Sequence, residues 1–372
     1  MISIIGTVGL PANYGGFETL VENLVVYHHR KKLANPITVY CSSKVYAERV
    51  PSFLSAELRY IPLKANGAQS VLYDILSLLS AVARSSDTII LLGVSGAIAL
   101  PLIKMFSSVR IITNIDGIEW RRDKWRGLAK HFLRFSEALA IRFSDTIIAD
   151  NDAIADYVRQ KYDIHPRVIA YGGDHAVQAE TANAPERVPT SGYALAVCRI
   201  EPENNAHMIL RAFAELPSQS LVFVGNWSKS NYGRDLRQQY SGHENIFLLD
   251  PIYDLGVLKS LRMHARCYVH GHSAGGTNPS LVEAMHFAIP VLAYDCSFNR
   301  STTEEQATYF RSSTELESAV IALKKINLEL SGLKMKEIAL RRYTWETIAQ
   351  HYFELADSSE NLSSTVESTR QP

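Results

Sequence analysis

The chain has 372 residues, and its 38 Lys and Arg residues balance 38 Asp and Glu residues, so the formal net charge is +0. This balance excludes a protein dedicated to nucleic-acid binding, which would be globally basic. Because a single hydrophobic core stops growing at about 250–300 residues, we expect two domains.

The cysteine spacing and the absence of targeting signals indicate where the protein is found but not what it does. The four cysteines are far apart and form no C-x-x-C pair, so we expect reduced thiols rather than a disulfide framework or a zinc site. The N-terminus lacks the basic start of a signal peptide. No run reaches the ~20 apolar residues of a membrane helix. We therefore expect a cytoplasmic protein.

In the first half of the chain, β-rich segments alternate with helical ones. The expected strands are 2–5, 37–41, 58–61, 88–92, 110–115, 146–149 and 167–169. The expected helices include 17–32, 71–84 and 128–143. This alternation predicts a parallel sheet with helices on both faces.

A second α/β unit follows a segment without apolar periodicity, 176–192, which is interpreted as a linker. Strands are expected at 193–198, 221–224, 246–248, 267–270 and 291–294, and helices at 205–214, 255–264, 279–287, 315–323 and 345–356. The fold class is therefore α/β, with two Rossmann-like domains facing across a cleft. In such sheets, ligands bind beyond the carboxyl ends of the strands.

A glycine-rich segment, 9–18, follows the first strand and opens the first helix. Paired glycines let the backbone approach a ligand, and free N–H groups at a helix start favour an anion. The segment matches neither G-x-G-x-x-G nor a Walker loop. The alternative is a structural turn in which Glu18 only stabilises the first helical turn. We favour ligand contact.

The loop after the strand 110–115 places Asp116 and Glu119 at the predicted cleft. Two carboxylates beside several cations can bind hydroxyls or move protons. The alternative is a surface loop whose charges pair with one another. Trp120 and Trp125 stand among these cations and favour a functional role, because indole faces can bind sugar rings. Indole rings also pack in ordinary cores.

Basic and apolar residues alternate over 124–135, as in a basic amphipathic helix. Such a helix can lie on an anionic membrane surface. It can equally be an ordinary surface helix, with its basic face in solvent and its apolar face packed on the core. Both interpretations stay open.

Arg199 follows the first strand of the second unit. A guanidinium there can clamp a phosphate, and Asn204 or Asn205 could cap the next helix. The alternative is an ion pair of Arg199 with Glu201 or Glu203 that orders the loop.

The segment 270–285 is the most informative. Gly275 and Gly276 lead to Thr277 and Asn278 at the start of a predicted helix, which aims backbone N–H groups at the cleft. That arrangement suits a diphosphate.

Glu283 lies about one turn into the same helix, where a carboxylate can accept from ribose hydroxyls. His270 and His272 suggest a metal at first sight, but no nearby Cys or carboxylate completes a ligand set. We expect hydrogen-bonded or exposed histidines and no metal.

Five segments together resemble the nucleotide-sugar glycosyltransferases of family 4, which have the GT-B fold, and more narrowly a bacterial rhamnosyltransferase subgroup. The segments are 11–18, 116–120, 171–174, 201–205 and 275–285. The broad family has a glutamate where this chain has Gly275 and a lysine where it has Asn204. The subgroup resembles this chain at both positions.

The resemblance implies a domain organisation. It gives an N-terminal acceptor-side domain (1–177), a C-terminal donor domain (193–343), a helix that crosses back to the N-terminal domain (344–357) and a flexible tail (358–372).

The resemblance also implies a reaction. L-rhamnose would pass from dTDP-L-rhamnose to a hydroxyl of a lipid-linked glycan, with retention, in O-antigen or capsule assembly. The partners would be the donor, the acceptor and the cytoplasmic face of the inner membrane, with no cofactor, metal or nucleic acid. The alternatives are a transferase using another nucleotide sugar such as a UDP-hexose, a sugar-nucleotide 2-epimerase and a non-catalytic sugar-nucleotide-binding module. An oxidoreductase fits less well, since no G-x-G-x-x-G is present.

The residues expected to act fall into three groups. The catalytic group is Asp116, Glu119, Arg199 and Glu283. The donor-binding group is Gly15, Gly16, Arg199, Asn204, Gly275, Gly276, Thr277, Asn278, Ser280, Leu281 and Glu283. The acceptor-binding group is Tyr14, Phe17, Glu18, Asp116 and Trp120.

Overall fold

The computed structural model describes residues 1–12, 15–118, 120, 127–324 and 327–357. The chain divides into two compact units. Unit 1 holds Met1–Asn114, Ser136–Ile147 and the chain from Glu346 onward, and unit 2 holds Ile115–Phe135 and Ile148–Trp345. The predicted tail, 358–372, lies outside the described residues.

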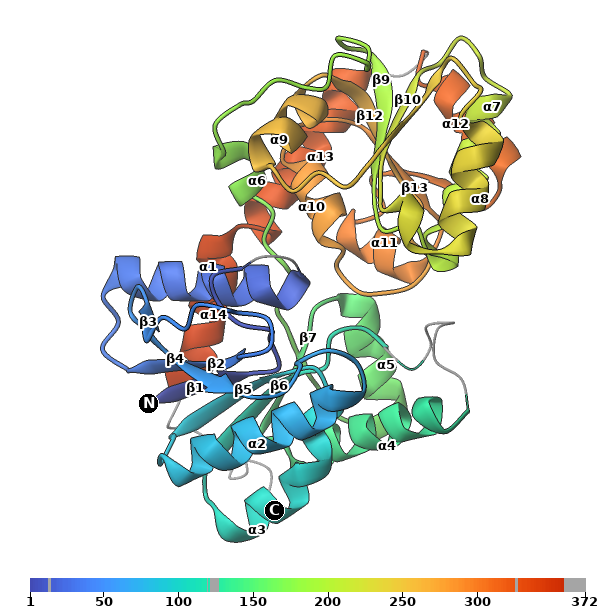
Figure 1. Ribbon diagram of the computed structural model, residues 1–372. Helices are drawn as coiled ribbons and strands as arrows, with labels where there is room; N and C mark the ends of the chain where they lie inside the picture. Colours follow the sequence, from blue (N-terminus) through green and yellow to red (C-terminus); the bar gives the residue numbers. More distant parts are fainter. Residues whose placement is uncertain (13–14, 119, 121–126, 325–326, 358–372) are drawn as a thin grey trace, which may run out of the picture. The chain divides into compact units, whose positions relative to one another are not determined.

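The first sheet has eight strands in the order β3-β4-β2-β1-β5-β6-β7-β8 (Figure 1). They are β1 (Ile2–Ile5), β2 (Ile37–Ser42), β3 (Ser52–Phe53), β4 (Ala56–Ile61), β5 (Thr88–Leu92), β6 (Arg110–Asn114), β7 (Thr146–Ala149) and β8 (Arg167–Val168). β3 pairs with β4 in the antiparallel sense, whereas β4-β2, β2-β1, β1-β5, β5-β6 and β7-β8 are parallel. The seven expected strands are confirmed, and the short β3 was not predicted.

The helices of this half are α1 (Gly16–Lys31), α2 (Ser70–Ala83), α3 (Leu100–Phe106), α4 (Gly127–Phe143) and α5 (Asp152–Tyr162). Every residue of β1, β2 and β5 is buried. Such continuous burial is typical of a parallel sheet that is covered on both faces.

The last helix, α14 (Trp345–Asp357), contributes to the packing of unit 1. The rings of Tyr27 and Phe353 stack with centroids 5.9 Å apart. The amide of Asn114 donates to the Tyr352 hydroxyl at 2.6 Å. These contacts join α14 to α1 and β6.

The second sheet has six strands in the order β11-β10-β9-β12-β13-β14, and all its pairs are parallel. They are β9 (Tyr193–Val197), β10 (Leu221–Val224), β11 (Ile246–Leu249), β12 (Ala265–His270), β13 (Val291–Tyr294) and β14 (Thr308–Phe310). The five expected strands are confirmed. The predicted linker 176–192 needs one correction, because a short helix, α6 (His175–Gln178), runs into it.

Helices cover both faces of the second sheet (Figure 1). They are α7 (Ala206–Ala214), α8 (Asn231–Tyr240), α9 (Leu255–Met263), α10 (Pro279–Met285), α11 (Ser297–Thr302), α12 (Ser313–Ala322) and α13 (Leu328–Arg342). Successive β9 residues alternate between two cores, since Ala194 and Ala196 belong to one and Tyr193 and Leu195 to the other. This alternation is what a strand with both faces buried requires. Among the described residues, no helix combines the length and apolarity needed to cross a membrane.

Candidate active site

Two of the predicted segments meet at the carboxyl ends of β9 and β12, which are neighbours in the sheet. The amide of Asn205 donates to the Gly271 carbonyl at 2.9 Å, and the backbone N–H of Ser273 donates to the Glu203 carbonyl at 2.9 Å. The loop that carries Arg199 is therefore fastened to the loop that leads to α10.

Arg199 presents an accessible guanidinium at this edge. Its side chain is 43% exposed, and Nη1 lies 3.9 Å from a Glu201 carboxylate oxygen, too far for a hydrogen bond. Asn204 is buried, and its amide donates to the Arg199 carbonyl at 2.8 Å. Asn204 therefore holds the backbone of Arg199.

The predicted helix cap is wrong. Asn205 occupies the N-cap position of α7 with φ 51°, but its side chain makes no capping hydrogen bond and binds Gly271 instead. The Asn205 side chain thus binds the neighbouring loop instead of capping α7. Rules based on short-range sequence patterns do not predict such a tertiary contact.

The glycine loop before α10 encloses a carboxylate. Gly275 has φ 123°, and a Cβ added to Gly276 would lie 2.0 Å from a carboxylate oxygen of Asp150. The backbone N–H of Thr277 donates to the same carboxylate at 3.1 Å, and the Thr277 hydroxyl donates to the Asp150 carbonyl. Gly276 is required here because only a residue without a side chain leaves room for Asp150.

The first turns of α10 hold the remaining predicted donor residues. Asn278 is its N-cap residue but makes no side-chain cap, and Pro279 stands in the first turn. Ser280 is partly exposed, whereas Leu281 is fully buried in the core, so only its backbone can face a ligand.

Glu283 on α10 is held from two sides. A guanidinium nitrogen of Arg262, whose side chain is 1% exposed, donates to Oε2, and His175 Nε2 lies 3.4 Å from Oε1. Burial alone would raise the pKa of Glu283, but the Arg262 and His175 side chains outweigh it and lower that pKa below its ordinary value. Glu283 is thus a fixed, ionised carboxylate.

Asp116 and its neighbours lie in unit 2. Asp116 adopts φ 57°, and a Cβ on Gly117 would lie 3.3 Å from the Gly275 backbone, so these two loops approach closely. Lys130, Arg134 and Lys161 lie 5.2–5.8 Å from the centre of the Trp120 ring. The Trp120 indole therefore takes part in cation–π contacts. Glu119 and Trp125 lie outside the described residues.

The glycine-rich segment of unit 1 folds back on itself. The Glu18 carboxylate accepts from the Val8 backbone N–H at 2.7 Å and from the Thr7 hydroxyl at 3.1 Å, and it is buried. Gly15, with φ 133°, has a Glu18 oxygen where a Cβ would be. Glu18 thus stabilises its own loop.

The other predicted residues of this segment are placed as follows. Gly16 begins α1, and Phe17 is half-buried near Gly93. Tyr14 lies outside the described residues.

His270 differs from expectation, whereas His272 is partly exposed. His270 is 1% exposed, and among the described residues its ring nitrogens have no hydrogen-bond partner. Its ring stacks on that of His272 at 4.3 Å. Burial and then His272 hold the pKa of His270 well below its ordinary value. His270 is a neutral core residue, neither hydrogen-bonded nor exposed.

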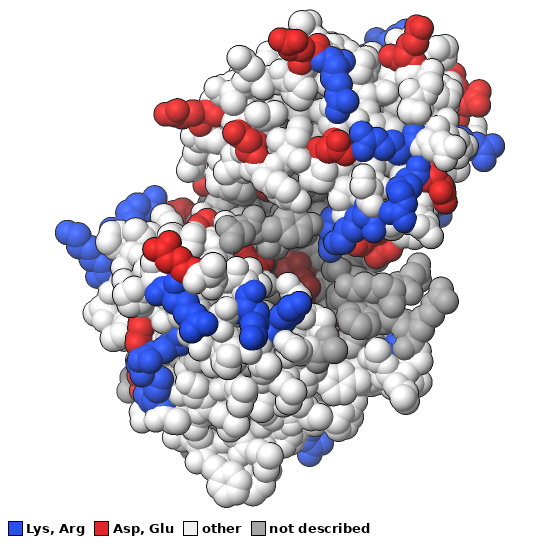
Figure 2. Space-filling model, viewed as in Figure 1, with Lys and Arg blue, Asp and Glu red and all other residues white. Residues whose placement is uncertain are grey.

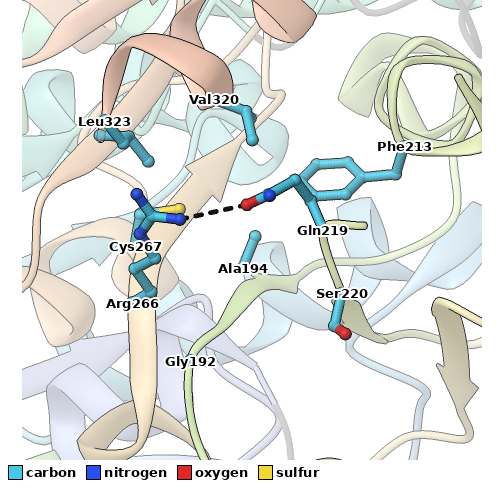
Figure 3. A pocket seen from close by; sticks show the side chains of 9 residues that line it. All are labelled: Gly192, Ala194, Phe213, Gln219, Ser220, Arg266, Cys267, Val320 and Leu323. Carbon is cyan, nitrogen blue, oxygen red and sulfur yellow. Dashed lines mark hydrogen bonds between the residues drawn. The ribbon is translucent and has the colours of Figure 1, made fainter. Parts of the chain in front are cut away.

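The described residues contain no metal-binding cluster, and one small cavity lies apart from the residues above. No group of three or more His, Cys, Asp or Glu side chains in that part of the chain could hold a metal. A cavity of about 10 Å³ lies at the amino ends of β9 and β12, beside Gly192 and Arg266 (Figure 3). It has room for about one water molecule, and it lies at the opposite ends of these strands from Arg199.

Sequence reasoning missed Asp150, His175 and Arg262. Asp150 directly follows the strand β7. Residues that follow parallel strands are expected at the ligand-binding edge of a sheet, so the sequence did contain a signal for Asp150. The segment 171–174 is part of the family resemblance, but that resemblance gives no role to His175, the residue after it. Arg262 gave no signal, because an arginine in an amphipathic helix is ordinarily solvated.

Both halves of the chain match known protein families. Residues 178–330 match the family model described as "Glycosyl transferases group 1". The protein is a glycosyltransferase. Residues 1–174 match "Domain of unknown function (DUF1972)", and no curated protein sequence matches the chain.

Solved structures show that this glycosyltransferase has the GT-B fold, as the sequence predicts. Sucrose-phosphate synthase from Thermosynechococcus elongatus has a TM-score of 0.81 at 14% identity, covering 95% of this chain and 98% of that one. Anabaena Alr3699/HepE in complex with UDP and glucose has a TM-score of 0.69 at 16% identity, covering 96% and 99%. A putative UDP-N-acetylglucosamine 2-epimerase from Listeria monocytogenes has a TM-score of 0.62 at 12% identity, covering 96% and 95%.

Proposed function

We propose that this glycosyltransferase takes L-rhamnose from dTDP-L-rhamnose, as in the rhamnosyltransferase subgroup of family 4 that its five segments resemble. The acceptor is a hydroxyl of a lipid-linked glycan in O-antigen or capsule assembly. The observation that carries the nucleotide-sugar donor is that the Arg199 loop is fastened to the loop leading to α10, along which Gly276, Thr277 and the ionised Glu283 follow. The relative solved with UDP and glucose supports the same donor class.

The donor roles follow from the chemistry of these groups. Arg199 pairs with the diphosphate, and the backbone of Gly275, Gly276 and Thr277 lines it. The Thr277 N–H already donates to the Asp150 carboxyl group at 3.1 Å. A diphosphate at this N–H has to displace that group. Glu283 accepts from a pentose hydroxyl.

The reaction proceeds with retention. The bond between the anomeric carbon and the phosphate oxygen breaks, and its electron pair stays on the phosphate. Arg199 and the loop amides stabilise that growing charge and so lower the barrier. The acceptor hydroxyl attacks on the same face, and its proton passes to the leaving phosphate oxygen. Asp116 orients the acceptor.

Anomeric NMR of the product tests this stereochemistry. A retained centre supports the leaving phosphate as the base. An inverted centre would require a carboxylate base, for which Asp116 is the candidate.

The two family matches support the proposed division into an acceptor-side domain, 1–177, and a donor domain, 193–343, with 344–357 as a returning helix. Acceptor binding is proposed for Asp116 and for the segment around Phe17. No metal takes part in the proposed step.

A lipid-linked acceptor also calls for contact with the membrane surface. The solvent-facing side of α2 and the adjoining α3 carries apolar side chains that are 44–81% exposed: Leu72, Leu76, Leu79, Leu102, Met105 and Phe106. Figure 2 shows few charged side chains over these two helices. On α4, Leu128 and Phe135 are 89% and 55% exposed beside Lys130 and Arg134. Apolar surface beside cations is what an anionic bilayer binds.

A donor panel tests the proposal. Purified protein is incubated with dTDP-L-rhamnose, UDP-glucose and UDP-N-acetylglucosamine, with and without lipid-linked glycans extracted from membranes, and the products are read by mass spectrometry. We expect one deoxyhexose to be added to the lipid only with dTDP-L-rhamnose. Transfer from a UDP-hexose would keep the enzyme class and refute the rhamnose assignment.

A sugar-nucleotide 2-epimerase is the second candidate, supported by the Listeria relative of the same fold. Isomerised donor in the reactions without acceptor would favour it.

A further inference from the structure

The segment Tyr171-Gly172-Gly173-Asp174-His175 and the start of α14 are fastened to each other. The Gly173 N–H donates to the Tyr343 carbonyl at 2.8 Å, and the Trp345 N–H donates to an Asp174 carboxylate oxygen at 2.8 Å. The ring of Tyr171 meets that of Trp345 edge-on, with centroids 4.9 Å apart. Two chain passages far apart in sequence thus form one rigid support within unit 2.

The two glycines are required by close packing. A Cβ on Gly172 would lie 2.4 Å from the Trp345 indole, and a Cβ on Gly173 would lie 2.8 Å from the Glu283 backbone nitrogen. Side chains at either position would push the segment away from α10. Their absence lets the chain run directly beneath Glu283.

The imidazole of His175 is oriented by this support. The Trp345 indole N–H lies 2.9 Å from His175 Nδ1. Because an indole N–H can only donate, Nδ1 accepts, and the proton of the neutral ring is on Nε2. Nε2 faces Oε1 of Glu283 at 3.4 Å. A directed chain therefore runs from Trp345 through His175 to Glu283.

The same carboxylate remains able to bind a ligand. Two carboxylate oxygens offer about four lone-pair positions. Arg262 donates to Oε2, and His175 Nε2 lies 3.4 Å from Oε1. The Glu283 side chain is 15% exposed and that of His175 is 17% exposed, so neither is sealed from solvent. Both oxygens can still accept from a hydroxyl.

We infer that His175 is a positioning residue for the nucleoside: held by Trp345, it fixes the Glu283 carboxylate to accept the 3′-hydroxyl of the donor pentose. This inference rests on the proposed function, since it assumes that Glu283 binds the donor. It gives a role to the segment 171–175 that the transfer step itself leaves unused.

Two His175 variants separate its two contacts. His175→Asn keeps an oxygen that can accept from Trp345 but has nothing at the Nε2 position. His175→Gln places an amide N–H near the Nε2 position and can still donate to Glu283. His243→Asn is the matched control, because His243 lies just before β11, at the opposite ends of the strands.

The test measures the dissociation constants of dTDP and of 3′-deoxythymidine diphosphate by titration calorimetry. We expect His175→Asn to weaken dTDP binding about tenfold, the size of one lost hydrogen bond to a charged group. Binding of the 3′-deoxy analogue should stay within about twofold of wild type, since it has no hydroxyl for Glu283 to hold. His175→Gln should restore dTDP binding, and His243→Asn should leave it unchanged.

If His175→Asn weakened the binding of both nucleotides equally, the site would be generally damaged and the inference would be overturned. Unchanged binding of both nucleotides would overturn it as well. If His175→Asn does not fold, Trp345→Phe carries the test. That variant keeps a ring over Gly172 and removes the indole N–H. It should weaken the binding of dTDP but not that of the 3′-deoxy analogue. Failure of the wild type to bind dTDP, with no turnover of any sugar nucleotide, would refute the proposed function as well; the other outcomes bear on His175 alone.

Discussion

Arg262 and Glu283 form a buried ion pair that joins α9 to α10. The Arg262 side chain is 1% exposed and that of Glu283 is 15% exposed. Removing one partner leaves the other charge without compensation, and this costs more than the pair contributes. The pair therefore makes the donor end of unit 2 sensitive to single substitutions.

Arg262→Met should lower the free energy of unfolding by about 3 kcal/mol, because Glu283 then stays buried without its main partner. Urea unfolding at pH 7.5 measures this. Arg237→Met is the control: Arg237 pairs with Asp250 at 2.6 Å, but their side chains are 34% and 61% exposed. An exposed pair should cost less than about 1 kcal/mol. Equal losses in the two variants would contradict the account of the buried pair.

The effect of Arg262→Met should depend on pH in a definite direction. The pKa of Glu283 is lowered in the folded state, so its ionised form adds stability above its ordinary value of 4.5. That contribution is lost as the pH falls through the folded-state value. The gap between wild type and Arg262→Met should therefore narrow in acid, and a constant gap would argue against ionised Glu283.

Asp74 should give the opposite pH dependence. It is 2% exposed on α2, and burial raises its pKa from 3.8 to about 7, despite hydrogen bonds from Ser95 and Gly96. A raised carboxyl pKa costs stability as the pH rises from the unfolded value to the folded one, by about 4 kcal/mol at most. Wild type should lose stability between pH 5 and pH 8, whereas Asp74→Asn should lose less. Parallel pH profiles would show that Asp74 does not titrate in this range.

Gly173→Ala should reduce both stability and donor binding. The added Cβ would meet the backbone of Val282 and Glu283 at 2.8 Å, where nothing can yield cheaply. We expect a loss of about 2 kcal/mol, typical of overpacking, and a raised KM for the donor. Gly242→Ala is the control, because no atom lies within 4 Å of its Cβ position. If Gly173→Ala matched Gly242→Ala in both measurements, the close packing under α10 would be refuted.

Replacing Met105 and Phe106 together by Ser should weaken binding to vesicles of phosphatidylglycerol and phosphatidylethanolamine. These side chains are 67% and 81% exposed on α3. Losing their apolar area should cost about tenfold or more in partitioning, as measured by co-sedimentation. Leu340→Ser, at a 55% exposed position on α13, should have no effect. Unchanged partitioning of the double variant would exclude this face as the membrane contact.

Much of the fold is predictable from sequence, because strands such as β5 and β10 are short apolar runs between turn residues. The loop containing Gly275 and Gly276 is also predictable, since both glycines stand just before a predicted helix, where they allow a close approach of the backbone to a ligand. The hydrogen-bond partners of the loop residues cannot be predicted in this way. Asn204 turns to the Arg199 carbonyl, Asn205 reaches Gly271 and Asp150 reaches Thr277. Each contact depends on which loops the folded sheet brings together, and local spacing does not contain that information.

Rhamnosyl transfer and the role of Arg199 are tested together by the rate at which dTDP is released from dTDP-L-rhamnose. This rate is measured with and without a lipid-linked acceptor, for wild type and for Arg199→Ala. We expect release that requires the acceptor and is lost in Arg199→Ala, because the leaving diphosphate then lacks its guanidinium. Release that is independent of the acceptor, or unchanged in Arg199→Ala, would contradict the proposed transfer.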